Sequence, residues 1–306
     1  MIIQPKIKGY AYALLATVAV STVYIFSKAA LNQVSLAQFG VYWFAFAILF
    51  NALFTLRTAE HRHFHPISGN SFKILVFLGM IELVATAAFY GAISITENPA
   101  IPSFLRNMEY IFVTLFGVFL LKERFTGGEI IGILLTFTGA FVISYQKGAT
   151  FYAYISGTSG LMLLATTVYG VRTIIAKKHI HTITPTMLAI NRAIFLLIFA
   201  LIFLKILGQS IRIPTTALIN IAIGSFFGPF LTSIGQYSAL KYIEASRAAI
   251  VQSTTALFVL LGAYLYFGKF PADYQLAGGM LTITGAMLLV IGHRISFRNR
   301  NNKTSH

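Results

Sequence analysis

The stretch LLATVAVSTVYIFSKAAL, residues 14–31, decides the fold because it occurs twice. Its second copy, LLATTVYGVRTIIAKKHI at 163–180, opens with the same four letters. A second repeated pair lies further along, LTFTGA at 135–140 and LTITGA at 281–286. The two offsets, 149 and 146 residues, are nearly equal, so the matches relate the halves of the chain along their whole length. We infer an internal duplication.

The composition places these repeats in a lipid bilayer. Hydrophobic residues make up 57% of the 306 residues, only 10% are charged, and the mean hydropathy is +0.77. A soluble domain carries about a quarter charged residues, and a spanning helix needs about 20 mainly apolar residues. The first apolar run is not a cleavable signal peptide, because its sequence recurs inside the chain. Apolar runs predict ten spans, at 10–31, 38–56, 74–95, 101–121, 127–146, 155–176, 185–206, 216–239, 248–267 and 274–293.

The number of spans in each half predicts how the repeats are related. Five is odd, so the second half enters the membrane from the opposite side and is inverted relative to the first. We therefore predict an all-α integral membrane protein, with ten transmembrane helices arranged as two inverted five-helix repeats. The repeats are expected at 9–147 and 154–293, followed by a basic cytoplasmic tail at 294–306. In such an arrangement a substrate site lies near the midplane, between the repeats.

The basic residues predict the orientation. A net charge of +15 would suggest nucleic-acid binding in a soluble protein, but membrane proteins gather lysine and arginine in their cytoplasmic connectors. With the N-terminus inside, fifteen basic residues fall on the cytoplasmic side, five on the outer side and three within spans. We therefore expect both termini in the cytoplasm, membrane lipids as partners and no nucleic acid.

Repeated landmarks carry a resemblance to a known family. Each half has a lysine at the end of its first span, and a KERF segment precedes a glycine-rich fifth span that ends in TGA. Together with the ten inverted spans, these features resemble the EamA branch of the drug/metabolite transporter superfamily over about residues 9–293. The remaining landmarks are SKAAL at 27–31, AKKHI at 176–180, YGAISITENPA at 90–100 and YSALKYIEASRAA at 237–249.

The resemblance implies a secondary active transporter in the bacterial cell (inner) membrane. Similar proteins move small organic metabolites, such as amino acids or related solutes, by alternating access, often outward, and they use no cofactor. An importer or uniporter of the same fold is the alternative. A channel is disfavoured because the chain has no ring of charged side chains and no filter sequence. An enzyme is not expected, since there is no phosphate-binding loop and no H-E-x-x-H pair.

The sequence departs from the family pattern at a few positions. Tyr110 stands where the family often has proline after a glutamate, here Glu109. The family's arginine early in the second span of a half appears as Arg192 in the seventh span, whereas Trp43 occupies the matching place in the first half. These departures leave the substrate open.

Two charged residues in SFLRNMEYIF, residues 103–112, are candidates for the site. Arg106 and Glu109 lie three apart on a helix, hence on one face, and each is costly inside a bilayer. They either form an internal ion pair that holds the fourth span in place, or Arg106 presents its guanidinium to a substrate carboxylate. We favour the second interpretation, in which Arg106→Met abolishes uptake without unfolding the protein.

Further candidates are polar or aromatic residues within spans. Glu82, midway through the third span, would be protonated if buried without a cation, as a proton-coupling group requires. The others can line a cavity, although interhelical hydrogen bonding or interfacial belts explain each one singly. They are Asn107, Tyr110, Tyr24, Tyr90, Gln236 and Gln252, with Trp43, Tyr169 and Tyr237 beside them.

Other features have simpler explanations. Arg172 and Arg192 are expected to extend toward the cytoplasmic surface. The histidines of HRHFH at 61–65 indicate a solvated loop, since a zinc site needs four ligands at defined spacing, and we expect no metal. Glycines in the fifth and tenth spans, at 128–139 and 278–285, indicate close helix packing within the chain or across a homodimer.

Overall fold

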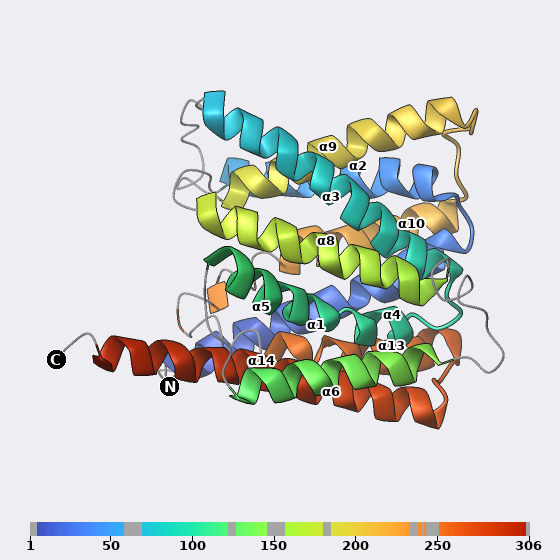
Figure 1. Cartoon of the computed structure of the whole chain (residues 1–306). Helices are drawn as coiled ribbons and strands as arrows, with labels where there is room; N and C mark the ends of the chain where they lie inside the picture. Colours follow the sequence, from blue (N-terminus) through green and yellow to red (C-terminus); the bar gives the residue numbers. More distant parts are fainter. Residues whose placement is uncertain are drawn as a thin grey trace.

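Most of the described residues are helical, and the helices group into ten spans (Figure 1). The computed structural model describes residues 5–57, 69–121, 127–145, 157–179, 185–232, 235, 238–239, 242 and 251–303. The spans of the first half are α1 (Pro5–Leu31), α2 (Leu36–Arg57), α3 (Gly69–Ile95), α4 (Ala100–Leu105) continued by α5 (Met108–Leu121), and α6 (Gly127–Ser144). Those of the second half are α8 (Thr158–His179), α9 (Pro185–Ile206), α10 (Thr215–Ser225) continued by the π-helix η2 (Phe226–Thr232), α13 (Thr255–Phe267) and α14 (Asp273–Lys303).

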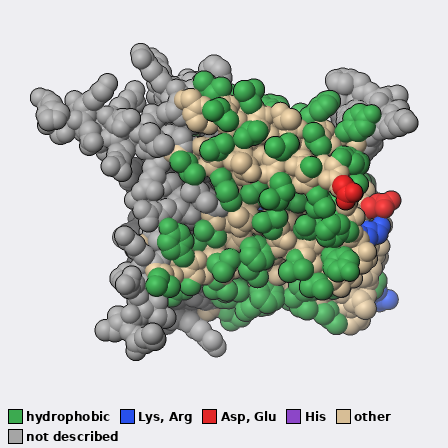
Figure 2. All heavy atoms as spheres, turned by 90° about the horizontal axis from the view of Figure 1, so that it is seen from below, with side chains coloured by type: hydrophobic (Ala, Val, Ile, Leu, Met, Phe, Trp, Pro, Cys, Tyr) green, Lys and Arg blue, Asp and Glu red, His purple; other side chains and the backbone are tan. Residues whose placement is uncertain are grey.

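The surface of the bundle is suited to lipid. Five described helices are long and apolar enough to cross a membrane, including Ile7–Leu31 and Ser71–Ile95. Large hydrophobic side chains point outward, among them Phe141 at 73% exposure and Leu265 at 74%. Figure 2 shows hydrophobic side chains across the middle of one face and the visible charged side chains at one end. The prediction of an all-α integral membrane protein is confirmed.

The two halves are inverted copies that interlock. Both termini lie at one end of the bundle, and the first helices of the halves, α1 and α8, run in opposite directions (Figure 1). The packing repeats when the halves are exchanged: α3 packs on α8 as α10 packs on α1, and α5 packs on α8 as α13 packs on α1. The pairs α2–α9, α4–α13 and α6–α14 map onto themselves. This is the packing that an inverted duplication predicts.

The glycine-rich spans α6 and α14 pack directly on each other. A Cβ added at Gly139 would lie 2.5 Å from the carbonyl oxygen of Gly278, and one at Gly285 would lie 2.7 Å from that of Gly132. Only hydrogen at these positions permits backbones to approach so closely. The glycines therefore serve a contact within the chain, and a homodimer through these spans stays a prediction.

Three spans are interrupted, and the sequence did not predict these interruptions. Between α4 and α5, the backbone N–H of Asn107 donates to Phe104 O at 3.1 Å, a bond to the third preceding residue instead of the fourth. The ninth span is interrupted at Thr254, whose hydroxyl donates to Val251 O at 2.6 Å and competes with the helical ladder. The eighth span widens into η2 around Pro229, which has no N–H to donate.

The helix that contains the tenth span continues past the predicted end of the span and into the basic tail. The sequence predicted an end at residue 293 with a separate tail beyond it, but α14 continues to Lys303. The segment 294–303 contains neither proline nor glycine, so no residue stops the helix there.

Candidate functional site

A cavity of about 590 Å³ lies between the two halves, and both halves line it. Its described lining residues come from α1, α2, α3, α4, α5, α8, α9, η2 and the start of the ninth span, whereas α6 and α14 contribute none. Asn51, Thr173 and Asn191 place it toward the end of the bundle that carries the termini, because they lie near the ends of α2, α8 and α9 on that side. The volume is that of a site for a small organic molecule.

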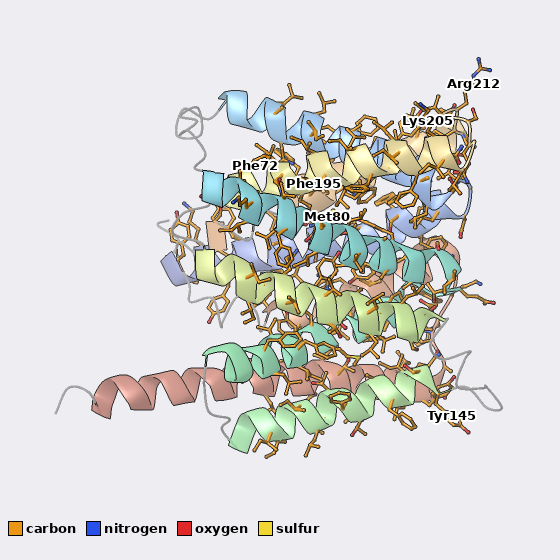
Figure 3. The ribbon with its side chains drawn as sticks, turned by 45° about the horizontal axis from the view of Figure 1, so that its top comes forward. Phe72, Met80, Tyr145, Phe195, Lys205 and Arg212 are labelled. Atoms are coloured by element: carbon orange, nitrogen blue, oxygen red, sulfur yellow. The ribbon has the colours of Figure 1, made fainter. Side chains whose placement is uncertain are left out.

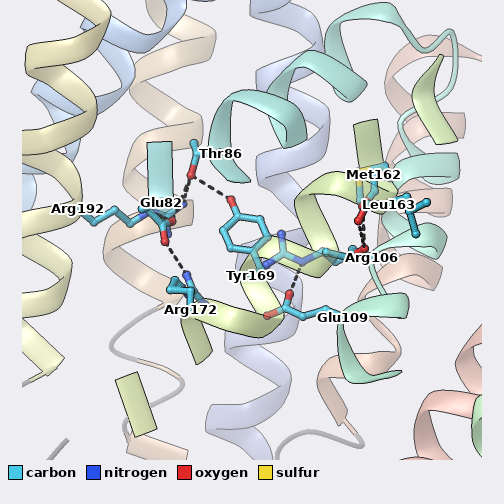
Figure 4. Close-up of polar contacts among 10 residues, drawn as sticks. Glu82, Thr86, Arg106, Glu109, Met162, Leu163, Tyr169, Arg172 and Arg192 are labelled. Carbon is cyan, nitrogen blue, oxygen red and sulfur yellow. Dashed lines mark hydrogen bonds and ion pairs between the residues drawn. The ribbon is translucent and has the colours of Figure 1, made fainter. Parts of the chain in front are cut away.

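The third span presents a carboxylate to two arginines of the second half. Glu82 Oε2 accepts a hydrogen bond from Arg172 Nη1 at 3.1 Å, and Glu82 Oε1 lies 2.6 Å from Arg192 Nε (Figure 4). The side chain of Glu82 is only 4% exposed. Its buried charge is therefore compensated by guanidinium groups from α8 and α9.

The fourth span contributes an ion pair at its interruption. Arg106 Nε donates to Glu109 Oε2 at 2.7 Å, as the spacing of three predicted. The guanidinium carbon of Arg106 lies 4.2 Å from the ring centroid of Tyr169 and 5.1 Å from that of Phe89. These two aromatic contacts restrict the guanidinium to one position.

A tyrosine and a threonine connect the two charged groups (Figure 4). The Thr86 hydroxyl donates to Glu82 Oε1 at 3.2 Å and lies 3.0 Å from the Tyr169 hydroxyl. Because the single Thr86 proton is used on Glu82, the Tyr169 hydroxyl donates to Thr86. The Tyr169 ring also contacts Arg106 and, at 4.9 Å, Arg172. The site residues of the two halves thus form one continuous polar network.

The residues predicted for the site converge on this cavity. Gln236 and Tyr237 lie outside the described residues, and so do the histidines of 61–65. The predicted site residues that line the cavity are Tyr24, Trp43, Glu82, Tyr90, Arg106, Asn107, Glu109, Tyr110, Tyr169 and Gln252.

Two arginines do not lie where the sequence analysis placed them. Arg172 and Arg192 were expected at the cytoplasmic surface, but both line the cavity and contact Glu82. A buried carboxylate in a membrane needs a cation as its partner. From this requirement alone, Arg172 and Arg192 could have been predicted as candidates for the partner of Glu82. The premise for proton coupling was a carboxyl without a cation, whereas Glu82 has two. Its coupling role stays a prediction.

Exchanging the two halves relates two walls of the cavity, and the charged lining residues all lie on one of them among the described residues. We call the lining residues of α3, α4, α5, α8 and α9, including the Arg106–Asn107 interruption, the charged wall, and those of α1, α2, η2 and residues 251–255 the neutral wall. The neutral wall has no charged residue among its described members, which are Val20, Val23, Tyr24, Trp43, Phe44, Ala47, Asn51, Gly228, Pro229, Thr232, Gln252 and Thr255.

Aromatic rings close the cavity toward the end opposite the termini. Trp43 packs against Phe39 at 4.8 Å and against Tyr90 at 5.6 Å between ring centroids, and Tyr24 packs against Phe89 at 5.3 Å. All five side chains are at most 5% exposed.

Beyond these rings, side chains of the first half bond to the second half. Gln38 Nε2 donates to Ser210 O at 2.7 Å and the Tyr42 hydroxyl donates to Ile211 O at 2.8 Å. Lys205 and Arg212 mark the same end in Figure 3. The cavity is therefore separated from this end by a packed layer that both halves build.

Comparison with known proteins identifies the family. The profile of the EamA-like transporter family matches residues 7–145 and again residues 158–291. The chain belongs to the EamA-like transporter family. It is therefore a multi-pass membrane transporter of the drug/metabolite transporter type, and this is a family of transporters rather than of enzymes.

Relatives of this EamA-like transporter include proteins named as uncharacterized transporters. One from Archaeoglobus fulgidus is 23% identical over 213 residues, covering 70% of this chain and 75% of the relative. Another from Clostridium kluyveri is 26% identical over 258 residues, covering 82% and 81%. A solved crystal structure with 13% identity matches 94% of this chain and 99% of its own length at a TM-score of 0.64, which supports the fold alone.

Proposed function

We propose that this EamA-like transporter is a secondary active exporter of a small organic metabolite, an amino acid or a related solute. It would operate by alternating access in the cell (inner) membrane, with both termini in the cytoplasm. The observation that carries the proposal is the cavity itself. Both halves line it, it contains charged side chains inside the membrane, and a packed layer separates it from one end. Intramembrane charge beside a cavity is typical of a substrate pathway.

The inverted halves supply a mechanism for alternating access. If each half adopts the conformation of the other, the packed layer moves to the opposite end and the cavity faces the other side of the membrane. The structure has the layer at the end away from the termini. With the termini in the cytoplasm, this state faces the cytoplasm, which is the state in which an exporter would take up its solute; the export direction itself rests on the family resemblance.

The interruption of the fourth span provides a candidate gate. Arg106 and Glu109 lie at or beside it, and Arg106 rests on Tyr169 of the opposite half. A substrate that contacts this pair would move α4 and α5 relative to α8, and a proton on Glu82 would release Arg172 and Arg192. Proton coupling at Glu82 is tested by flux with and without a pH gradient.

The test is solute flux into reconstituted vesicles. Labelled amino acids and related metabolites should show saturable uptake and accelerated counterflow when the vesicles are preloaded with unlabelled solute. Arg106→Met should abolish uptake, whereas Lys269→Met, a loss of charge at a 48% exposed side chain, should not. A unitary conductance in planar bilayers would reject a carrier, and full uptake by the Arg106→Met variant would leave the ion pair a structural role alone.

A further inference from the structure

The charges on the described part of the cavity wall do not balance. Its described lining residues include three arginines and two glutamates, a net charge of +1. Arg106 and Glu109 neutralise each other, so the surplus does not lie there. It lies in the second group, where Glu82 contacts both Arg172 and Arg192; Glu109 acts on Arg172 as well, so Arg192 is the guanidinium that Glu82 alone faces. A guanidinium that lacks its own counter-ion within a membrane favours an anion.

Arg192 has donor capacity that the described residues do not use. Its Nε lies 2.6 Å from Glu82 Oε1, but the N–H does not point at that oxygen, so the contact is an ion pair without a hydrogen bond. Its Nη2 donates to Thr86 Oγ1 at 3.5 Å, the outer limit of a hydrogen bond. A guanidinium carries five N–H donors in a planar fork that matches a carboxylate. The Arg192 side chain is 40% exposed and can receive a ligand.

A second unused donor lies on the same charged wall. Asn107 is 5% exposed, lines the cavity and has a buried Nδ2 without a hydrogen-bond partner. Such a donor is costly unless a ligand accepts its hydrogen bond. The charged wall therefore offers a surplus cation to a ligand, whereas the Nδ2 atom of Asn107 is itself buried in this state.

The neutral wall offers the opposite chemistry. Val20, Val23 and Phe44 present apolar surface and Trp43 adds an indole ring, while the polar side chains of this wall, such as Gln252 and Thr255, carry no charge. A ligand that fills the cavity must meet both walls at once. One end of it then carries a negative charge, and its remainder is apolar or aromatic.

We propose that the substrate is an amphipathic organic monoanion whose carboxylate binds Arg192 and Arg172, not Arg106. This inference rests on the proposed transport function and narrows its substrate, from amino acids and related solutes to solutes of that kind with a net negative charge. A monoanion cancels the surplus charge, whereas the ammonium group of a zwitterionic amino acid restores it. Arg106, paired with Glu109 and stacked on two rings, acts at the gate.

The experiment uses three compounds with one carbon skeleton: the anion hydrocinnamate, the uncharged hydrocinnamide and the zwitterion phenylalanine. Trp43 is the only tryptophan of the chain and lines the cavity, so quenching of its fluorescence in the purified full-length protein reports occupancy. Hydrocinnamate should bind at least about tenfold more tightly than either of the other two, as expected for a hydrogen-bonded charge pair. Equal affinities, or no quenching by any of the three, would overturn the proposal.

Variants of Arg192 separate charge from shape. Arg192→Met brings the net charge of the described wall to zero and leaves Glu82 paired with Arg172, so the fold is retained. It should abolish the preference for hydrocinnamate over hydrocinnamide, whereas Arg192→Lys should keep part of it. Lys269→Met, outside the cavity, is the matched control and should bind as the unaltered protein does. A preference that survives in Arg192→Met would refute the assignment.

Failure of this inference and failure of the transport proposal give different results. Saturable, charge-selective quenching without counterflow in vesicles would keep the anion site and reject the carrier. Counterflow of phenylalanine equal to that of hydrocinnamate would keep the carrier and reject the monoanion.

Discussion

The two walls of the cavity are copies of one backbone with opposite chemistry. At the offset of 146 residues between the repeats, Glu82 corresponds to Gly228 and Arg106 to Gln252. At the offset of 149, Arg192 corresponds to Trp43. Both members of each pair line the cavity. The same positions of the two repeats thus face the cavity, but the residue types at these positions differ.

The difference teaches how a symmetric scaffold can hold an asymmetric solute. Alternating access needs halves that can exchange conformations, and the matched helix packing preserves this property. Recognition needs a site with a defined polarity, because one cluster of guanidiniums orients a charged ligand and two symmetric clusters would not. The charged and the neutral wall meet both needs.

The largest expected effect comes from a charge placed on the neutral wall. Trp43→Arg removes a side chain that is 1% exposed and puts a cation where the structure shows no carboxylate among the described lining residues of that wall. Loss of a buried aromatic side chain costs about 3–5 kcal/mol, and a charge at mid-membrane at least about 2.5–3.5 kcal/mol more. Size-exclusion profiles in detergent should show aggregate. Trp43→Phe should remain monodisperse. A monodisperse Trp43→Arg variant would show that this wall tolerates a cation, which would contradict the prediction.

The second prediction removes the central carboxylate of the charged wall. Glu82→Gln leaves two guanidiniums without their shared counter-ion, and breaking such a buried pair costs about 3–5 kcal/mol. The melting temperature in detergent should fall sharply and transport should be lost. The double variant Glu82→Gln/Arg192→Met returns the wall to its original net charge, so it should recover part of the stability. Equal stability of the single variant and the parent would contradict the arrangement.

A smaller effect is expected when charge is kept and shape is changed. Arg106→Lys can still pair with Glu109 but loses the planar guanidinium that lies over the Tyr169 and Phe89 rings. Stacked cation–aromatic contacts contribute about 0.5–2 kcal/mol, so the loss in unfolding free energy should be of that order. Transport should fall more than binding if the pair acts as a gate. An Arg106→Lys variant with parental turnover would exclude a role for the planar guanidinium.

The smallest effect tests an ion pair outside both walls. Glu97 Oε2 accepts from Lys269 Nζ at 3.1 Å, but Glu97 is 88% exposed. Exposed pairs contribute at most about 1 kcal/mol. Glu97→Gln should therefore shift the melting temperature far less than Glu82→Gln does. A comparable shift would mean that burial is not what distinguishes the two carboxylates.

Many single residues of the candidate site were predicted from the sequence, but their partners on other helices were not. Arg106 and Glu109 were predicted as a pair because a spacing of three is a contact on any helix, and the structure has them 2.7 Å apart. Glu82 was singled out by its depth, but its partners were not, because Arg172 and Arg192 are 90 and 110 positions away along the chain. Contacts at such separations depend on which faces of α3, α8 and α9 meet.

The amino-acid sequence alone determined the membrane location, the ten spans, the duplication and its inversion, because composition, run length and parity are properties of the chain itself. It did not determine where the spans are interrupted, since the apolar runs continue past Asn107 and Thr254 and a run does not mark a break within it. Only the tertiary structure decided that two arginines share one glutamate and that the opposite wall is neutral. The physical reason is that charge balance within a cavity is a property of side chains from several helices at once, and no single helix carries it.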